Sequence, residues 1–192
     1  MIAGPNGAGK TTMAEVLLSQ SEDVYADFLN ADKIAQGLSP LRPESVNQQA
    51  GKLMLRRFHD CLASNINFAF ETTASGLSYA THLKKAKETD YSINLIFLWL
   101  AGPDLAIKRV AQRVKQGGHD IPEEDIIRRY YRGLKNLLEL YLPLADTALI
   151  LDNSFIESGI RKIIAQKDLD TSLRIEDSEI WEKLQGQVYV KV

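Results

Sequence analysis

The stretch Gly4-Pro5-Asn6-Gly7-Ala8-Gly9-Lys10-Thr11 matches the phosphate-loop pattern G-x-x-x-x-G-K-[ST] at every fixed position. Glycine lets the backbone curl until successive N–H groups point inward at phosphate oxygens. The lysine brings a cation to the β- and γ-phosphates, and the hydroxyl after it is a Mg²⁺ ligand. The pattern predicts a site for ATP and Mg²⁺, with Thr11 as metal ligand, formed by Gly4, Pro5, Asn6, Gly7, Ala8, Gly9, Lys10, Thr11 and Thr12.

The segments on either side of this loop have the expected character. Met1–Ala3 is apolar, and Lys10–Ser19 has a helical pattern whose N-terminus adds positive partial charge at the phosphates. An internal strand usually has about five or six residues. Either the first strand is short, or the chain as given starts downstream of the true first residue.

Beyond the loop, short apolar runs alternate with longer helical patterns. We expect strands at Tyr25–Leu29, Phe68–Phe70, Ile93–Leu100 and Thr147–Leu151, and helices at Glu44–Ser64, Leu77–Glu88, Pro103–Gln116, Pro122–Leu142 and Ile156–Gln166. The nearly continuous apolar run at Ile93–Leu100 suits a strand buried on both faces. This order predicts an α/β protein, a three-layer fold with a mainly parallel sheet flanked by helices.

We interpret residues 1–167 as one domain, with a lid at about 113–142. Residues 168–192 do not continue the alternation of strand and helix patterns, and we expect them to form a C-terminal extension. Their ending, Val188-Tyr189-Val190, suggests a small edge strand or a hairpin.

The composition is that of an ordinary globular chain. Lys and Arg number 23 against 25 Asp and Glu, and the net charge of −2 gives no reason to expect a nucleic-acid partner. A single cysteine, Cys61, excludes an intramolecular disulfide and fits a reducing compartment. No apolar run approaches the roughly 20 residues that span a membrane, and no signal peptide opens the chain. We therefore expect a cytoplasmic protein with no membrane partner.

Two carboxylates are expected at the tips of strands, where open α/β sheets bind their ligands. Asp32 follows the second expected strand and Glu71 the third, and a carboxylate there can deprotonate an acceptor hydroxyl or hold Mg²⁺ through water. Asp32 also suits the N-cap of a helix at Lys33–Gln36, and Glu71 a solvated strand end. Asp152 follows the last apolar strand with no glutamate after it, so we interpret it as a turn residue.

Arginines gather in the second half of the chain on either side of a glycine pair. They are Arg109, Arg113, Arg128, Arg129 and Arg132, with Gly117-Gly118 between the two groups. Phosphoryl transfer needs cations around the moving phosphoryl group and needs water excluded, and a mobile lid with arginines supplies both. The alternative is a solvated charged face. The Gly117-Gly118 pair is expected to act as a flexible hinge, and His119 is interpreted as a structural residue of that hinge.

Several motifs in this order resemble the zeta-toxin-like P-loop kinase family, and most closely its compact stand-alone branch, often labelled predicted ABC-type ATPase or UDP-N-acetylglucosamine kinase. They are Gly4–Thr12 (GPNGAGKTT), Phe28–Asp32 (FLNAD) with Pro40 (LSP), Glu71–Gly76 (ETTASG), Gly117–Tyr130 (GGHDIPEEDIIRRY) and Gly133–Leu137. The resemblance covers about residues 1–155. It departs at Ser75, where the toxins often carry a basic residue.

The resemblance implies that residues 1–167 form a P-loop kinase domain, a three-layer P-loop kinase fold with a helical lid. It also implies transfer of the γ-phosphoryl of ATP to the 3′-hydroxyl of the sugar in UDP-N-acetylglucosamine. By this similarity Lys10 binds phosphate, Asp32 is the general base, and Glu71 and Thr73 contact the sugar nucleotide. Arg113 and Arg129 would be the lid arginines that clamp the transferred group, while Tyr130 and Asn136 would be structural. An antitoxin protein is a possible partner.

Two other functions stay open at this point. One is a P-loop ATPase or nucleotide switch without a small-molecule acceptor, although neither an L-S-G-G-Q-like signature nor a strand ending in Asp-Glu is found. The other is a kinase for a different sugar, nucleotide or polynucleotide hydroxyl. A polynucleotide kinase would need a basic groove, of which the net charge gives no sign.

Overall fold

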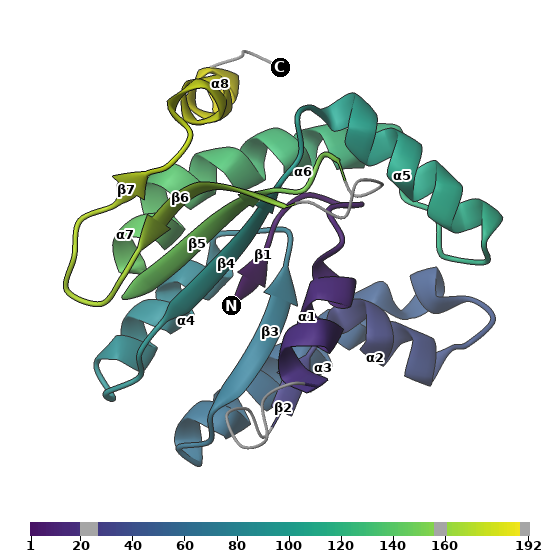
Figure 1. Ribbon diagram of the computed structural model, residues 1–192. Coiled ribbons are helices and arrows are strands. Elements are labelled where there is room, and N and C mark those ends of the chain that lie inside the picture. The colour runs from purple at the N-terminus through teal and green to yellow at the C-terminus, as the bar shows by residue number, and fades with distance from the viewer. Residues whose placement is uncertain (20–26, 156–160, 189–192) are drawn as a thin grey trace. The chain divides into compact units, whose positions relative to one another are not determined.

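The computed structural model describes residues 1–19, 27–155 and 161–188. They form two compact units (Figure 1). The larger unit comprises Met1–Lys10 and Thr72–Val192, and the smaller comprises Thr11–Glu71. No helix in the described ranges has both the length and the apolar character that crossing a membrane requires.

A five-stranded part of the sheet lies in the larger unit. Its order is β1 (Ile2–Ala3), β4 (Asn94–Trp99), β5 (Thr147–Asp152), β6 (Lys162–Lys167) and β7 (Arg174–Ile175). The first three strands are parallel to one another, and the last two pairings are antiparallel. The strand before the phosphate loop is short, as the sequence suggested.

The core of this unit is built on β4. Leu95, Phe97, Leu98 and Trp99 are each no more than 2% exposed, so both faces of the strand are covered. That burial explains the nearly continuous apolar run, because a strand with one solvated face would alternate apolar and polar residues. Burying such side chains contributes about 1.5–3 kcal/mol each.

Helices cover this part of the sheet. They are α4 (Ser78–Lys87), α5 (Pro103–Lys115), α6 (Glu123–Asn136), the short α7 (Leu142–Leu144) and α8 (Ser178–Val188), and a π-helical segment, Leu137–Tyr141, joins α6 to α7. In Figure 1 α6 runs behind the strands. It buries Ile126, Tyr130 and Leu134. These side chains recur at intervals of four, which places them on one face of the helix.

The smaller unit pairs two strands with three α-helices. It contains α1 (Lys10–Ser19, whose first residue belongs to the larger unit), β2 (Asp27–Leu29), α2 (Ala31–Leu38), a 3₁₀ turn at Pro43–Val46, α3 (Asn47–Ala63) and β3 (Phe68–Thr72). Strands β2 and β3 are parallel. The ring of Phe58 on α3 packs edge-on against Phe68 and Phe70, with centroids 4.9 and 5.2 Å away. This aromatic cluster fixes α3 on the sheet.

The sequence predicted most elements, and an α/β fold with a mainly parallel sheet flanked by helices is confirmed. The helix expected at Glu44–Ser64 begins with the 3₁₀ turn, and Tyr25 lies outside the described residues. The helix expected at Ile156–Gln166 is wrong. Residues 156–160 lie outside the described ranges, and Lys162–Lys167 is strand β6, antiparallel to β5.

The error has a physical cause. Ile156, Ile160, Ile163 and Ile164 have the spacing of a helical face, but the β-branched pair Ile163-Ile164 also suits a strand. Pairing with the central strand β5 outweighs the periodicity. In the C-terminal extension the edge strand is β7, at Arg174–Ile175. Val188 instead ends helix α8, which the sequence did not predict, and residues 189–192 are not described.

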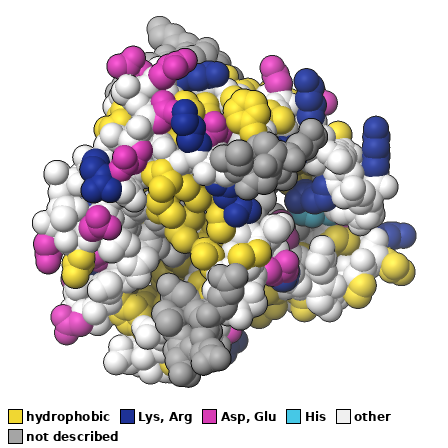
Figure 2. Space-filling view, in the orientation of Figure 1, with side chains coloured by type: hydrophobic (Ala, Val, Ile, Leu, Met, Phe, Trp, Pro, Cys, Tyr) yellow, Lys and Arg dark blue, Asp and Glu magenta, His cyan; other side chains and the backbone are white. Residues whose placement is uncertain are grey.

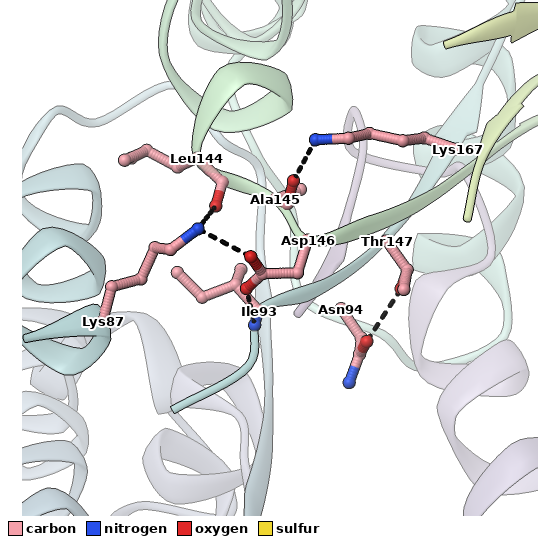
Figure 3. Close-up of polar contacts among 8 residues, drawn as sticks. All are labelled: Lys87, Ile93, Asn94, Leu144, Ala145, Asp146, Thr147 and Lys167. Atoms are coloured by element: carbon pink, nitrogen blue, oxygen red, sulfur yellow. Dashed lines mark hydrogen bonds and ion pairs between the residues drawn. The ribbon is translucent and has the colours of Figure 1, made fainter. Parts of the chain in front are cut away.

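A polar cluster fixes the ends of the strands opposite the phosphate loop (Figure 3). The Lys87 ammonium donates to the Leu144 carbonyl (3.2 Å) and to Asp146 Oδ1 (2.6 Å), and the Ile93 N–H donates to Asp146 Oδ2 (2.7 Å). Lys167 on β6 reaches the carbonyl of Ala145 (2.6 Å). Asp146 thus joins α4 to the starts of β4 and β5.

The charged form of Asp146 stabilises the fold. Burial raises the pKa of this carboxyl, but the Ile93 N–H and the Lys87 ammonium together lower it more, so the net pKa lies below the ordinary value. A carboxyl whose pKa is depressed on folding contributes stability above its unfolded pKa, about 3.9, and loses it as pH falls through the folded value.

We predict that Asp146→Asn lowers the free energy of unfolding by about 1.5–3 kcal/mol at pH 7, the range for hydrogen bonds to charged groups. Urea titrations at several pH values should show this difference constant above about pH 5 and shrinking below about pH 4. Glu139→Gln is the control, because its pair with Lys135 is solvent-exposed and should be worth under about 1 kcal/mol. A difference that persisted unchanged to pH 2 would contradict the assignment.

Candidate active site

The phosphate loop has the backbone that its glycines were expected to permit. Gly4, Gly7 and Gly9 have φ values of +143°, +74° and +83°, which L side chains rarely adopt. A Cβ on Gly4 would lie 2.3 Å from the carbonyl oxygen of Leu98. The loop therefore starts in direct contact with strand β4, and only glycine fits there.

Two polar side chains of the loop are buried. Lys10 and Asn6 are each 7% exposed, and the Lys10 ammonium donates to the Pro5 carbonyl at 2.9 Å. Asn6 Oδ1 has no hydrogen-bond partner among the described residues. Leaving a buried acceptor unpaired costs about 1–3 kcal/mol, and burying a cation costs more unless it is paired. The unpaired Asn6 oxygen leaves the loop able to accept a hydrogen bond from a ligand.

Two residues hold the loop from outside: Asn153, which the sequence did not single out, and Arg109, one of the arginines considered for a lid. Asn153, which follows β5, donates from Nδ2 to the carbonyl of Ala8 at 2.6 Å. Arg109 on α5 donates to the carbonyls of Asn153 and Ser154, both at 2.9 Å, and more weakly to Gly7 at 3.5 Å. These donors pair with two carbonyl oxygens of the loop, those of Gly7 and Ala8. They also pair with the carbonyls of Asn153 and Ser154, which follow β5. Asn153 stands directly beyond a strand tip, the signal that could have identified it.

Asp152, interpreted from the sequence as a turn or base-side residue, is the last residue of strand β5. It is 4% exposed, and its Oδ1 accepts from the N–H of Ser154 (2.8 Å) and from the Ser154 hydroxyl (2.5 Å). The same hydroxyl oxygen accepts from the N–H of Ala101 (2.9 Å), at the end of β4. Asp152 therefore shapes the turn that presents Asn153.

In the smaller unit, Glu71 joins the tips of β2 and β3 to helix α1. Its Oε2 accepts from the Thr11 hydroxyl and from Asn30 Nδ2, each at 2.7 Å. Glu71 is thus a hydrogen-bonded carboxylate rather than a solvated strand end. Asn30 is a further residue that the sequence did not single out, although it lies two positions before the expected Asp32.

Asp32 is not the N-cap that was its alternative interpretation. Helix α2 begins at Ala31, and its cap is Asn30, whose Oδ1 accepts from the N–H of Lys33 at 3.0 Å. Asp32 lies in the first helical turn and is exposed. No hydrogen bond or ion pair ties its carboxylate to the residues that the structure describes.

Of the predicted lid arginines, Arg113 and Arg129 are half-buried, whereas Arg128 and Arg132 are exposed. Arg113 donates from Nη2 to the His119 carbonyl at 3.1 Å, and its buried Nε has no partner in the described part of the chain. Arg129 Nη2 lies 3.6 Å from Asp125 Oδ2, one helical turn earlier. Thr73 is half-buried, with its hydroxyl 2.8 Å from that of Ser75.

The Gly117-Gly118 pair, expected to be a hinge, forms a capping turn. The N–H of Gly118 donates to the Arg113 carbonyl (2.9 Å), and that of Gly117 to Val114 (3.0 Å). With Gly117 at φ +89°, this is the Schellman arrangement that ends a helix. A Cβ on Gly118 would lie 2.5 Å from Cγ of Arg113. The turn therefore packs against the Arg113 side chain and holds its direction.

The residues present suit Mg²⁺ bound together with phosphates. Mg²⁺ takes oxygen ligands and is usually held by one or two protein groups plus substrate phosphates. Thr11 offers a hydroxyl oxygen beside the Glu71 carboxylate. The described ranges hold no group of three or more His, Cys, Asp or Glu side chains that could bind a metal by themselves.

Comparison with known proteins agrees with this geometry. The model of an AAA domain family, AAA_33, matches residues 1–128. The chain belongs to this family. It is 32% identical over 127 residues to an uncharacterised protein of Haemophilus influenzae, an alignment that covers 66% of this chain and 88% of that one.

Solved structures share the fold over the whole chain. A chain of the AvrRxo1-ORF1:AvrRxo1-ORF2 complex with sulphate ions superposes with a TM-score of 0.74 and 16% identity, and the complex with ATP gives 0.72. This protein covers 64% of the length of those chains. A chain of the PezAT toxin–antitoxin system of Streptococcus pneumoniae gives 0.66 at 16% identity, covering all of this chain and 78% of that one. The P-loop kinase-like fold and the resemblance to zeta-toxin-like proteins are confirmed.

We predict that Gly118→Ala lowers the free energy of unfolding by about 1–3 kcal/mol, the usual cost of overpacking. The added methyl group must displace the Arg113 stem. Gly186→Ala, in α8, is the matched control, because a Cβ there meets open space, and it should stabilise by about 0.5–1 kcal/mol. Thermal and urea unfolding measure both variants. Equal stabilisation by the two substitutions would show that the turn does not pack on Arg113.

Proposed function

We propose that this protein is an ATP-dependent kinase whose acceptor is a hydroxyl of a sugar nucleotide, the 3′-hydroxyl of the N-acetylglucosamine unit of UDP-N-acetylglucosamine. The supporting observation is the loop around Lys10, a buried ammonium turned toward its own glycine-rich backbone. A lysine at this position of the phosphate-loop pattern reaches the β- and γ-phosphates. The nature of the acceptor rests on the resemblance of the Glu71–Gly76 segment to zeta-toxin-like kinases.

The phosphate loop binds and orients the nucleotide in this proposal. Lys10 and the loop N–H groups bind the β- and γ-phosphates, and Thr11 contributes its hydroxyl oxygen to Mg²⁺. The bound ion neutralises charge on the phosphate oxygens. Glu71, already hydrogen-bonded to Thr11, keeps that hydroxyl oriented, and with Thr73 it contacts the sugar nucleotide.

Asp32 is the general base on the acceptor hydroxyl. Its carboxylate takes the hydroxyl proton while the hydroxyl oxygen forms a bond to the γ-phosphorus and the bond from that phosphorus to ADP breaks. An exposed carboxylate that no described residue binds can accept that proton. Arg113 and Arg129 bind the equatorial oxygens of the transferred group, where charge accumulates.

An antitoxin is a further proposed partner. The PezAT structure carries the name of a toxin–antitoxin system, and the proposal for this chain extends that resemblance. Figure 2 shows acidic and basic side chains interspersed on the visible face. That face gives no support to a nucleic-acid partner, which would require a basic stripe.

The test is mass spectrometry of a panel of UDP-sugars, free sugars, nucleosides and a 5′-hydroxyl oligonucleotide incubated with the protein, ATP and Mg²⁺. We expect one phosphate to be added to UDP-N-acetylglucosamine. Asp32→Asn should lower that rate by at least about a hundredfold, the lower range for acid–base catalysis, and leave ATP affinity within about twofold. Lys10→Ala should weaken ATP binding itself. Loss of ATP without any phosphorylated product would instead favour a nucleotide-driven switch.

Arg129 and Arg132 of α6, the first half-buried and the second exposed, give a matched pair for the lid proposal. We predict that Arg129→Ala lowers kcat at least tenfold, because a half-buried guanidinium is lost from the transferred phosphoryl group, about 1.4 kcal/mol or more. Arg132→Ala, an exposed position, should leave kcat within about twofold. Steady-state kinetics decides, and the reverse order would assign the clamp to the other face of the helix.

A further inference from the structure

The loop after β3, Thr73–Gly76, is held along one side by a single helical element. A Cβ on Gly133 would lie 2.6 Å from the carbonyl oxygen of Thr73, so the α6 backbone contacts that carbonyl directly. Asn136 donates from Nδ2 to the Ala74 carbonyl at 2.8 Å, and both residues are buried. We call Gly133, Asn136 and Tyr141 the loop seat.

The third contact comes from Tyr141. Its hydroxyl donates to the Gly76 carbonyl at 2.6 Å, and burial raises the pKa of this phenol to about 12. The tyrosine is 1% exposed. The phenol therefore keeps its proton throughout the physiological range and stays a permanent donor to the loop.

A π-helical segment allows both donors to face the loop. In an α-helix two residues five apart, such as Asn136 and Tyr141, are turned about 140° from each other. Between them the chain is π-helical, Leu137–Tyr141, and the N–H of Leu142 donates to the Leu137 carbonyl. Five residues then make little more than one turn, which returns both side chains to the same face. Such segments are rare and often occur at functional sites.

The loop itself has a backbone that must be held. Ala74 is 1% exposed and has φ +57°, a left-handed conformation that is unfavourable for a residue with a Cβ. Its N–H donates to the Thr72 hydroxyl at 3.1 Å. Strain of this kind persists only where surrounding contacts fix it. The strain and the three seat contacts together keep the loop in one conformation.

The loop carbonyls of Thr73, Ala74 and Gly76 contact the loop seat. The hydroxyl groups of the loop belong to Thr73 and Ser75. Thr73 and Ser75 lie on either side of Ala74, with their hydroxyl oxygens 2.8 Å apart and both side chains half-buried. One hydroxyl donates to the other, so the pair offers one further donor and several lone pairs. Such a pair can match vicinal hydroxyls or an amide of a sugar, which are neutral donors and acceptors.

We propose that the loop seat positions the Thr73–Ser75 hydroxyl pair to recognise the sugar hydroxyls of the acceptor, with Asn136 and Tyr141 as positioning residues and Ser75 as a determinant of specificity. This inference rests on the proposed kinase function. It assigns a role to the π-helical segment and to Ser75 that phosphate binding alone does not need.

Two conservative substitutions test the seat in the full chain. Tyr141→Phe removes only the hydroxyl, and Asn136→Asp keeps the shape while replacing the donor with an acceptor. With UDP-N-acetylglucosamine as probe, we expect each to raise the acceptor KM at least tenfold while the ATP Kd and kcat change less than threefold. Tyr131→Phe, on the same helix, is the control and should change neither constant.

Ser75→Ala tests the hydroxyl pair, with the exposed Ser78→Ala as control. We expect a five- to tenfold rise in acceptor KM for Ser75→Ala alone. Hydrogen exchange of residues 72–77 provides a readout that needs no activity, and it should be faster in Tyr141→Phe than in Tyr131→Phe. A purely structural role would lower the melting temperature and the active fraction without a selective change in acceptor KM.

The outcomes separate this inference from the proposed function. If the unsubstituted protein phosphorylates the sugar nucleotide and the seat variants keep its KM, the inference is wrong and the kinase function stands. Unchanged exchange of residues 72–77 in Tyr141→Phe would also overturn it. If the unsubstituted protein transfers no phosphate to any sugar nucleotide, the proposed function fails, and the recognition role fails with it even where exchange shows that the seat holds the loop.

Discussion

The buried Lys10 cation inside the phosphate loop is the constraint on which the larger unit depends. Lys10 is 7% exposed, and its loop can present amides inward only if its carbonyls are occupied elsewhere. Asn153 supplies a donor for Ala8, and Arg109 supplies donors for Asn153, Ser154 and Gly7. The end of β5 and one face of α5 thus support a loop that is more than a hundred residues earlier in the chain. The phosphate site is a property of this whole unit rather than of its glycine-rich motif.

The same pairing of backbone carbonyls with side-chain donors occurs elsewhere in the larger unit. Carbonyls of irregular segments are occupied by side chains distant in sequence, as Ala74 is by Asn136 and Gly76 by Tyr141. Gln187 on α8 donates to Ala101, and its Oε1 accepts from the indole of Trp99. A buried carbonyl left without a donor costs about as much as a lost hydrogen bond. Irregular segments can therefore lie in the interior only where a helix brings a donor to each of them.

Patterns that are local in sequence were the reliable guide to this structure. The phosphate loop, helix α1 and the buried strand β4 could be predicted because spacing and residue type determine them over a few residues. Strand β6 could not, because its apolar spacing also fits a helix and only pairing with β5 decides. Sequence placed Asp32 and Glu71 near strand tips. It could not show that Asn30 caps α2, or that Glu71 bonds to Thr11, since those choices depend on which side chains reach one another.

The family match ends at residue 128, yet the sheet does not. Strand β4, with both faces apolar, pairs along its full length with β5, which lies beyond that limit. A fragment trimmed to the matched domain would leave this strand with an unsatisfied edge and a bare apolar face, the combination that promotes aggregation. Any attempt to transplant the nucleotide-binding half into another protein must therefore carry the C-terminal third along with it.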